Sequence, residues 1–310
     1  MKVVVTGGAG FIGANLCREL ASRDSVDKVV ALDNLSTGYA ENLRGVDAEL
    51  VVGSILDRDL LNDVVSDADA VVHLAARPSV PRSVADPVAS HEANATGTLY
   101  VLEACRRRET PLIAASSSSV YGPTVELPKN EYMPTRPQSP YAASKLAAES
   151  YVLSFGATYK TPTLAFRFFN VYGPLQSAGH AYAAAIPAFV DAALRGNPLH
   201  VHGDGKQTRD FTFVGSVVKV LAEAAERGVR HDRPVNLAFG TRVSLLELIK
   251  KIATIADRDL KIEFEPPRAG DVRDSQASQD ILGELFPGHT PVSLDEGLTQ
   301  TIRWYSDRLQ

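Results

Sequence analysis

The chain has 310 residues, of which 45% are hydrophobic and 22% charged, and its formal net charge is −5. This size and composition are typical of a globular protein with one large α/β domain or two closely joined lobes. The sequence has no block of basic residues that would bind nucleic acid and no apolar run of the roughly 20 residues that span a membrane, so we expect it to bind neither. It also lacks a signal-peptide pattern, so we expect a cytoplasmic protein.

The first half of the chain alternates short β-branched runs with helical stretches. We expect strands at Val3–Thr6, Lys28–Leu32, Leu50–Val52, Ala70–His73, Leu112–Ser116 and Thr163–Arg167. Helices are expected at Phe11–Ala21, Leu60–Val65, Val88–Arg107 and Tyr141–Tyr159, with Cys17 and Cys105 as buried thiols. Continuous apolar strands separated by helices predict a parallel sheet covered on both faces. With right-handed crossovers, the predicted fold class is α/β, a doubly wound, parallel-sheet Rossmann domain.

The pattern changes after Gly173, where loops become longer and richer in glycine, proline and charge. Here we expect helices at Ala183–Arg195, Val217–Arg227 and Ser244–Ala256, and strands at Leu199–His202, Val235–Leu237 and Lys261–Phe264. We therefore predict a Rossmann domain over residues 1–175, which also receives segments from about 200–240. Residues 176–310 would form a smaller, discontinuous α/β lobe that binds the substrate.

A glycine motif between the first strand and the first helix predicts a dinucleotide site. Gly7, Gly10 and Gly13 have the spacing GxxGxxG, which allows a tight turn and close approach of the backbone to a pyrophosphate. The free N–H groups at the helix start would bind the phosphates. Asp33 follows about 20 residues later, where a carboxylate binds the adenosine ribose and disfavours a 2′-phosphate. We therefore expect NAD rather than NADP, although Asp33 could instead only cap the next turn.

Tyr141 and Lys145 are the candidate catalytic residues. Their spacing of four residues places both side chains on one face of a helix. A tyrosine phenol with a pKa of about 10 is a poor base at neutral pH, but a nearby ammonium ion favours its phenolate form. The segment SSSSVYG (residues 116–122) ends the fifth strand and could supply a serine hydroxyl to the same substrate oxygen.

These motifs resemble the extended short-chain dehydrogenase/reductase family, in particular its nucleotide-sugar (UDP-hexose) 4-epimerase branch. The resemblance covers essentially the whole chain and includes GGAGFIG, DNLSTG, HLAA, NATGT, SSSSVYG, YAASK, RFFNVYGP, GDGKQTRDF and RAGD. It implies that Ser117 is the catalytic serine, Tyr141 the base and Lys145 a ligand of the nicotinamide ribose. Ser116 could assist, and the choice between the two serines stays open.

The same resemblance implies the residues that contact NAD. Ser54 stands where the family often has aspartate, which puts one adenine contact in doubt. Besides the three glycines and Asp33, the implied cofactor-binding residues are Phe11, Ile12, Asn34, Ser36, Thr37, Gly38, Ser54, Ile55, Leu74, Ala75, Ala76, Asn94, Ser116, Tyr141, Lys145 and Phe168.

The implied substrate site lies mainly in the second lobe. The guanidinium groups of Arg209 and Arg268 suit a diphosphate, although surface salt bridges with the neighbouring Asp210 and Asp271 are the alternative. The resemblance implies that Asn170 binds the diphosphate and Asp271 the nucleotide ribose. His200 and His202 would lie near the base, unless they are simply exposed strand residues. On the sugar side, the implied residues are Ser79, Ser117, Ser118 and Ser275.

The residues after the catalytic serine favour epimerisation. Dehydratases of the family carry an Asp-Glu pair there, because elimination needs an acid and a base, whereas this chain has Ser118 and Ser119. We predict an NAD-dependent UDP-hexose 4-epimerase that needs no metal and acts on UDP-glucose/UDP-galactose or, because Ser275 is small, on the N-acetylhexosamine pair. UDP-glucuronate 4-epimerisation is the alternative, since arginines flank the loop from Arg77 to Arg82. A 4,6-dehydratase or a non-catalytic NAD-binding regulator is less favoured.

The resemblance also implies a homodimer. Members of the family commonly pair through two helices of each subunit, which here would be Val88–Arg107 and Tyr141–Tyr159. The same mixed small and apolar faces could instead be part of the core of a monomer.

Overall fold

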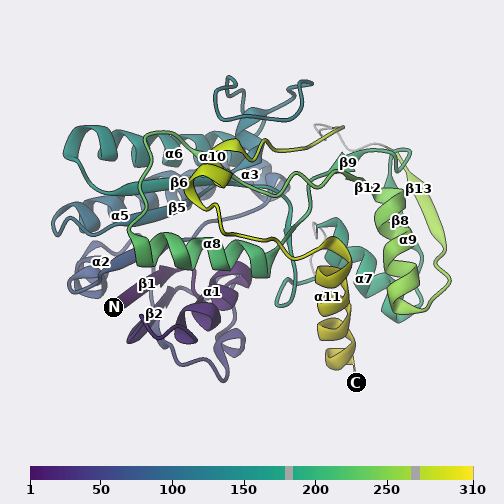
Figure 1. Ribbon diagram of the computed structural model, residues 1–310, viewed down its shortest axis with the longest axis horizontal. Helices are drawn as coiled ribbons and strands as arrows, with labels where there is room; N and C mark the ends of the chain where they lie inside the picture. The colour runs from purple at the N-terminus through teal and green to yellow at the C-terminus, as the bar shows by residue number, and fades with distance from the viewer. Residues whose placement is uncertain (179–183, 267–272, 310) are drawn as a thin grey trace.

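A seven-stranded parallel sheet forms the centre of the protein, in the strand order β11-β6-β5-β4-β1-β2-β3 (Figure 1). The computed structural model describes residues 1–178, 184–266 and 273–309. The strands are β1 (Lys2–Thr6), β2 (Lys28–Asp33), β3 (Glu49–Val52), β4 (Ala70–His73), β5 (Leu112–Ser117), β6 (Thr163–Phe168) and β11 (Val235–Leu237). The order reverses between β1 and β4, so the predicted doubly wound Rossmann fold is confirmed.

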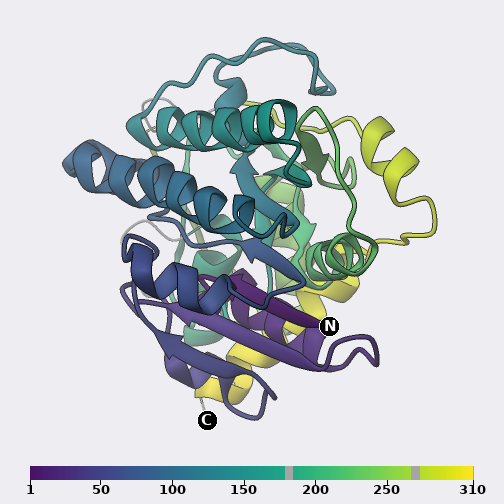
Figure 2. The ribbon, with the colours of Figure 1, turned by 90° about the vertical axis from the view of Figure 1, so that its left-hand side faces the viewer.

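Helices cover both faces of the sheet because its strands are apolar on both sides. In β1, Val3 and Val5 belong to the core cluster on one face and Val4 to the cluster on the other. One face is covered by α1 (Phe11–Ala21) and α8 (Val214–Arg227), and the other by α2 (Arg58–Val65), α5 (Gly97–Arg106) and α6 (Pro140–Tyr159). Figure 2 shows α5 and α6 side by side. Each fully buried valine stabilises this packing by about 1.5–3 kcal/mol. Both cysteines are buried free thiols, as expected.

The helix predicted over Val88–Arg107 is present without a break, but a π turn in its middle divides it into three segments. They are α4 (Pro87–His91), a π-helical turn η2 (Glu92–Thr96) and α5, preceded by the unpredicted α3 (Val80–Ala85). The start of α4 is set by Pro87 in its first turn and by Asp86, whose Oδ1 accepts a hydrogen bond of 3.1 Å from the Ala89 N–H. A π turn interrupts the regular helical periodicity. A search of the sequence for a 3.6-residue repeat therefore does not detect such a turn.

The elements that do not join the sheet lie beside it, on the right of Figure 1, where the second lobe was predicted. Its helices α7 (Ala185–Arg195), α9 (Leu245–Ala256) and α11 (Leu294–Leu309) pack on one another. Three strand pairs complete it: β8 (Leu199–His202) with β13 (Ile262–Glu265), β9 (Thr208–Arg209) with β12 (Val243–Ser244), and β10 (Thr212–Phe213) with β7 (Val171–Tyr172). Helix α11 was not predicted, because only two of its buried residues, Leu298 and Ile302, are aliphatic.

Three later segments return to the Rossmann half. Strand β11 pairs with β6, α8 packs on α1, and α10 (Asp280–Leu285) lies against β11. Two 3₁₀ turns, η1 (Ala40–Leu43) and η3 (Ser118–Tyr121), follow β2 and β5. Segments from 214–227 and 235–237 therefore join the first half, while the division into two domains stays a prediction. No helix in the described residues is long and apolar enough to cross a membrane.

Candidate active site

A cavity of about 910 Å³ opens at the carboxyl ends of the strands, where doubly wound proteins bind their ligands. Its wall combines the β1–α1 turn with the ends of β2, β4, β5 and β6. The structure brings nearly all predicted cofactor and catalytic residues to this wall: Gly7, Gly10, Phe11, Ile12, Gly13, Asp33, Asn34, Ser36, Thr37, Ser54, Ile55, Leu74, Ala75, Ala76, Ser116, Ser117, Tyr141, Lys145 and Phe168.

The β1–α1 turn is packed so closely that side chains do not fit. Gly7 has a φ of +71°, and a Cβ there would lie 2.7 Å from the Ala75 nitrogen. A Cβ at Gly13 would lie 2.0 Å from the Gly7 carbonyl oxygen. Helix α1 begins at Phe11 with no side-chain cap and no acidic residue in its first turn. Its free N–H groups line the cavity and fit a dinucleotide pyrophosphate.

The Asp33 carboxylate, at the end of β2, is fixed by a hydrogen bond to the β1–α1 turn. Its Oδ2 accepts a hydrogen bond of 3.0 Å from the Ala9 N–H, and its Oδ1 accepts one of 2.8 Å from the Leu35 N–H. Both oxygens keep free lone pairs that can accept from ribose hydroxyls. Gly38 does not line the cavity but packs behind the carboxylate, where a Cβ would lie 3.0 Å from Asp33 Oδ2.

Asn94 is the other predicted cofactor residue that does not reach the cavity wall. Its Oδ1 accepts from the Arg77 N–H at 2.7 Å, and its Nδ2 donates to the Arg77 carbonyl at 3.3 Å and to Ser144 Oγ at 2.9 Å. The buried amide therefore orders the loop after β4, whose residues Ala75, Ala76 and Arg77 do line the cavity.

Tyr141 and Lys145 lie in the first turns of α6, at the side of the cavity. Ser139 caps this helix by accepting a hydrogen bond of 3.1 Å from the Ala142 N–H. Burial raises the pKa of Tyr141, and hydrogen bonding with Ser117 opposes that rise. Burial also lowers the pKa of Lys145 to about 8, and the Glu149 carboxylate opposes that fall. Lys145 is thus removed from water, while the partly buried Tyr141 lies beside the Ser117 hydroxyl.

The two candidate serines at the end of β5 differ in what their hydroxyls contact. Ser116 Oγ donates to Glu149 Oε2 at 2.6 Å, so its proton is engaged inside the protein. Ser117 Oγ instead accepts from the Ser119 N–H at 3.2 Å and from Ser119 Oγ at 2.9 Å. Its own proton faces Tyr141, whose pKa this hydrogen bond lowers, at the wall of the cavity. This geometry favours Ser117 over Ser116.

Glu149 and its partner Arg167 were not among the predicted site residues, although Glu149 acts directly on Lys145. The spacing of Tyr141, Lys145 and Glu149 could have identified the carboxylate, because all three are four residues apart on one helix. Arg167 lies on β6, and its place in an otherwise apolar strand was the available indication of a buried charge.

A second cavity of about 240 Å³ adjoins the first, and Val171 lines both. Four predicted substrate residues are in its wall: Asn170, His200, His202 and Arg209. Glu265 lies between the two histidines, with its oxygens 2.9 Å from His200 Nδ1 and 3.2 Å from His202 Nδ1. Asn170 Nδ2 donates to the Asp210 carbonyl at 3.1 Å.

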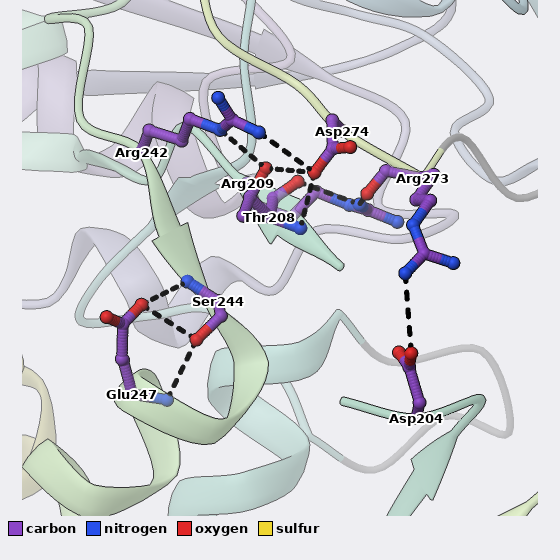
Figure 3. Close-up of polar contacts among 8 residues, drawn as sticks. All are labelled: Asp204, Thr208, Arg209, Arg242, Ser244, Glu247, Arg273 and Asp274. Carbon is purple, nitrogen blue, oxygen red and sulfur yellow. Dashed lines mark hydrogen bonds and ion pairs between the residues drawn. The ribbon is translucent and has the colours of Figure 1, made fainter. Parts of the chain in front are cut away.

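Arg209 is held in a network that joins β9, β12 and the segment at 273–274 (Figure 3). Its Nη1 donates to the carbonyls of Thr208 at 2.9 Å and Arg273 at 3.0 Å. Asp274 Oδ1 accepts from Thr208 Oγ1 at 2.5 Å and pairs with Arg242 at 3.5 Å. The guanidinium is therefore oriented by backbone oxygens before any ligand binds, as a fixed anion site requires.

The remaining predicted substrate residues are placed differently. Ser275 is buried beside β9, and its N–H donates to the Thr208 carbonyl at 3.1 Å. Ser79 caps α3 at a φ of +93°, and Ser118 begins η3; neither belongs to the wall of the larger cavity. Arg268 and Asp271 lie outside the described residues.

Comparison with known sequences supports this interpretation of the cavity. The profile of the NAD dependent epimerase/dehydratase family matches residues 3–238. The UDP-glucose 4-epimerase of Mycolicibacterium smegmatis is 36% identical over 100% of both chains. The UDP-N-acetyl-alpha-D-glucosaminuronate decarboxylase of Bacillus cytotoxicus is 33% identical over 99% of this chain and 98% of its own.

Solved structures show the same similarity. The UDP-N-acetylglucosamine 4-epimerase from Methanobrevibacter ruminantium, in complex with UDP-N-acetylmuramic acid, has a TM-score of 0.93 and 34% identity, covering 99% of this chain and 98% of its own. The UDP-glucose 4-epimerase of Thermus thermophilus, in complex with NAD, has a TM-score of 0.88 and 34% identity, covering 98% of this chain and 99% of its own. The similar proteins thus include 4-epimerases and a decarboxylase.

Proposed function

The chain belongs to the NAD dependent epimerase/dehydratase family, and we propose from this premise that it inverts C4 of a UDP-hexose. NAD is its cofactor, and the tight β1–α1 turn and the Asp33 carboxylate fit it. When bound, NAD would supply reversible hydride transfer at C4 of the sugar, and it would be regenerated in each turnover. The substrate pair is UDP-glucose with UDP-galactose, or the corresponding N-acetylhexosamines.

Three residues of this chain carry out the acid–base chemistry in the proposal. Tyr141 takes the proton of the C4 hydroxyl and later returns it. The Ser117 hydroxyl, whose oxygen is held by Ser119, donates a hydrogen bond to the same sugar oxygen. Lys145 supplies a positive charge that lowers the energy of the Tyr141 phenolate. We place the catalytic group at Ser117, Tyr141 and Lys145 on this basis.

The observation that carries the choice of epimerisation is the pair of neutral residues after Ser117. Elimination of water would need an acid and a base at the sugar, and Ser118 and Ser119 provide neither. The Ser119 hydroxyl is also engaged, since it donates to Ser117. The described carboxylates in the wall of the larger cavity are Asp33 and Glu92, on elements other than β5 and η3. Oxidation and reduction at C4 need no further ionisable group.

The second cavity is proposed to hold the UDP part of the substrate. Arg209, fixed by the carbonyls of Thr208 and Arg273, would bind the diphosphate together with Asn170. His200 and His202 would lie beside the uracil. Ser275 is buried beside β9 and is not in the described wall of either cavity, so the N-acetylated pair rests on the resemblance and not on this residue. Two similar proteins bear the names UDP-glucose 4-epimerase and UDP-N-acetylglucosamine 4-epimerase.

UDP-glucuronate 4-epimerisation is the second candidate, because two arginines line the larger cavity. Arg77 and Arg82 both reach its wall, and Arg77 Nη1 pairs with Asp86 Oδ2 at 3.1 Å. A carboxylate at C6 of the sugar could pair with such a guanidinium. The protein named as a UDP-glucuronic acid 4-epimerase from Bacillus cereus shares the fold, with a TM-score of 0.90 and 29% identity.

We also propose that the protein is a homodimer formed through α3, α4 and α6. Val84 on α3 and Val88 on α4 are each 66% exposed, and Tyr151 on α6 is exposed as well. Both α3 and α4 pack against α6, so these side chains belong to neighbouring elements. Covering them with a second copy would remove apolar surface from water.

The test is an NMR time course of the purified protein, without added NAD, on UDP-glucose, UDP-N-acetylglucosamine and UDP-glucuronate separately. Appearance of the C4-inverted sugar supports epimerisation and retention of NAD through purification, and the relative rates identify the substrate. A Tyr141→Phe variant is the matched control and is expected to leave each sugar unchanged. If no sugar is converted even after NAD is added, the proposal is wrong. A 4-keto product would indicate a dehydratase instead.

A further inference from the structure

A buried ion pair lies directly behind the candidate catalytic lysine. Glu149 on α6 and Arg167 on β6 are only 3% and 4% exposed at their side chains, respectively. Two hydrogen bonds join them: Arg167 Nη2 to Glu149 Oε1 at 2.6 Å and Arg167 Nε to Oε2 at 2.9 Å. Ser116 Oγ on β5 donates to the same Oε2 at 2.6 Å. One carboxylate therefore connects three elements of the active-site wall.

We propose that Glu149 is a positioning residue that keeps Lys145 charged and that, held in place by Arg167, it also holds the end of β5, and therefore Ser117, against Tyr141. The proposal rests on the proposed function, because it concerns the same Tyr141, Lys145 and Ser117. Neither Glu149 nor Arg167 is in the wall of the larger cavity as far as the structure describes it, so both act through the residues that are.

Helical geometry places the carboxylate next to the lysine. Tyr141, Lys145 and Glu149 are each separated by four residues on α6, so they lie in one row along the helix. The next element on that side is β6, from which Arg167 reaches back to Glu149. From the cavity inward, the order is therefore the Tyr141 phenol, the Lys145 ammonium group, the Glu149 carboxylate and the Arg167 guanidinium.

Arg167 is itself held from the side of β11. Its Cζ lies 4.5 Å from the ring centroid of Tyr121, whose hydroxyl donates to Asn236 Oδ1 at 2.7 Å. Stacking on an aromatic ring suits a guanidinium, which remains charged when buried. The Glu149 carboxylate therefore has a permanently charged partner, although it is withdrawn from water.

The groups that face Lys145 include one negative charge among the described residues. On α6 these groups are Tyr141 and Glu149, each four residues from Lys145. On β5, the neutral hydroxyls of Ser116 and Ser117 contact Glu149 and Tyr141, respectively. On β4, His73 bonds to Thr6 at 2.7 Å and to Thr98 at 2.9 Å, and burial lowers its pKa to about 3, so it is neutral. Arg167 approaches from β6 behind Glu149.

The charge of Lys145 therefore depends on Glu149. Burial lowers the pKa of Lys145 to about 8 even with the carboxylate present. Side chains four residues apart on a helix are about 5–6 Å apart, and at an effective dielectric constant of about 20 one unit charge at that distance shifts a pKa by roughly 2 units. Without Glu149, the lysine would lose its proton near neutral pH and no longer favour the Tyr141 phenolate.

The test is a ¹³Cε-lysine NMR titration of the full-length protein with bound NADH, whose nicotinamide ring carries no charge. The Lys145 resonance is assigned with Lys145→Arg. Glu149→Gln leaves Arg167 unpaired, so of the three variants it should lower the titration midpoint of Lys145 the most, by about two pH units. Glu149→Gln/Arg167→Met removes both charges and should move it down by less. Arg167→Met leaves the carboxylate to Lys145 alone and should move it up.

Controls separate this effect from a loss of structure. Glu103→Gln removes a carboxylate from an exposed pair with Arg106 on α5 and should leave the midpoint unchanged. Glu149→Asp keeps the charge and should hold the midpoint near that of the wild type. Either single charge removal can unfold the protein, because it leaves one buried charge unpaired, whereas the double variant replaces both by neutral groups of similar volume.

The order of midpoints decides the proposal. A midpoint that does not move in the folded double variant would overturn it. A wild-type midpoint at the ordinary lysine value of about 10.4 would overturn it without any variant, because Lys145 would then need no carboxylate to stay charged. Sugar conversion is measured in parallel. Shifted midpoints without conversion of any sugar would contradict the proposed function alone, and conversion with unmoved midpoints would contradict only the positioning role.

Discussion

Gly13→Ala tests whether the β1–α1 turn is packed as closely as the structure shows. The new methyl carbon would lie 2.0 Å from the Gly7 carbonyl oxygen and 2.8 Å from both the Gly7 carbonyl carbon and Gly8 Cα. All three atoms belong to the backbone, so no side-chain rotation relieves the clash. The turn and the start of α1 must move apart, and the N–H groups of Phe11 to Gly13 must move with them.

The size of the effect follows from that displacement. Overpacking a close contact costs about 1–3 kcal/mol of folding free energy, which for a chain of this size lowers Tm by roughly 2–10 °C. Loss of a single charge-assisted hydrogen bond to the pyrophosphate costs about 1.5–3 kcal/mol, or roughly 10- to 150-fold in NAD affinity. We therefore expect Gly13→Ala to purify largely without NAD.

The assay is NAD binding by calorimetry, together with thermal unfolding of the NAD-free protein. Gly283→Ala on α10 is the matched control, because a Cβ there meets no atom within 4 Å. It should leave NAD binding unchanged and raise Tm slightly, since alanine favours a helix over glycine by about 0.5–1 kcal/mol. Gly13→Ala with the NAD affinity and Tm of the wild type would refute the reasoning.

Three further predictions concern the acid–base residues, a buried carboxylate and the proposed dimer. Tyr141→Phe should bind NAD normally but lower kcat by about 10²- to 10⁴-fold, as expected for loss of a general base; normal turnover would assign the proton transfer elsewhere. Burial raises the pKa of Asp210 to about 7, above the unfolded value of about 3.8, so the stability that comes from its protonated form is lost as pH rises through that range. Asparagine does not titrate, so the Tm of Asp210→Asn minus that of the wild type should increase from pH 5 to pH 8. A difference in Tm that does not change with pH would contradict the raised pKa. Val84→Glu together with Val88→Glu should convert the dimer into a folded monomer in sedimentation experiments, and an unchanged sedimentation coefficient would place the interface elsewhere.

Much of the cofactor half could be predicted because its patterns are local. The strands from Lys2 to Phe168 are apolar runs, and their boundaries differ from the prediction by at most one residue. The glycines at 7, 10 and 13 and the acidic end of β2 are also short-range features. The helix at Val88–Arg107 was also predicted, but not the π turn that contains Asn94 and interrupts its repeat. Asn94 turns inward there to order the Arg77 loop.

The second half was harder to predict because its elements are short and depend on distant partners. Strands β7, β9, β10 and β12 have two residues each and exist only through their pairing. Helix α11 buries Leu298, Thr301, Ile302 and Tyr305, a face with too few aliphatic residues to identify by hydrophobic periodicity. The orientation of Arg209 depends on the Arg273 carbonyl, 64 residues away along the chain.

The sequence by itself determined the parallel sheet, the dinucleotide turn and the pairing of Tyr141 with Lys145, because each depends on spacing within one strand, turn or helix. Only the tertiary structure distinguished Ser116 from Ser117, since the two hydroxyls differ in partners contributed by another helix and by the following turn. It also revealed that Glu149 pairs with Arg167 behind Lys145. The charge state of a buried lysine depends on every group that surrounds it in space, and those groups come from strands and helices far apart in the chain.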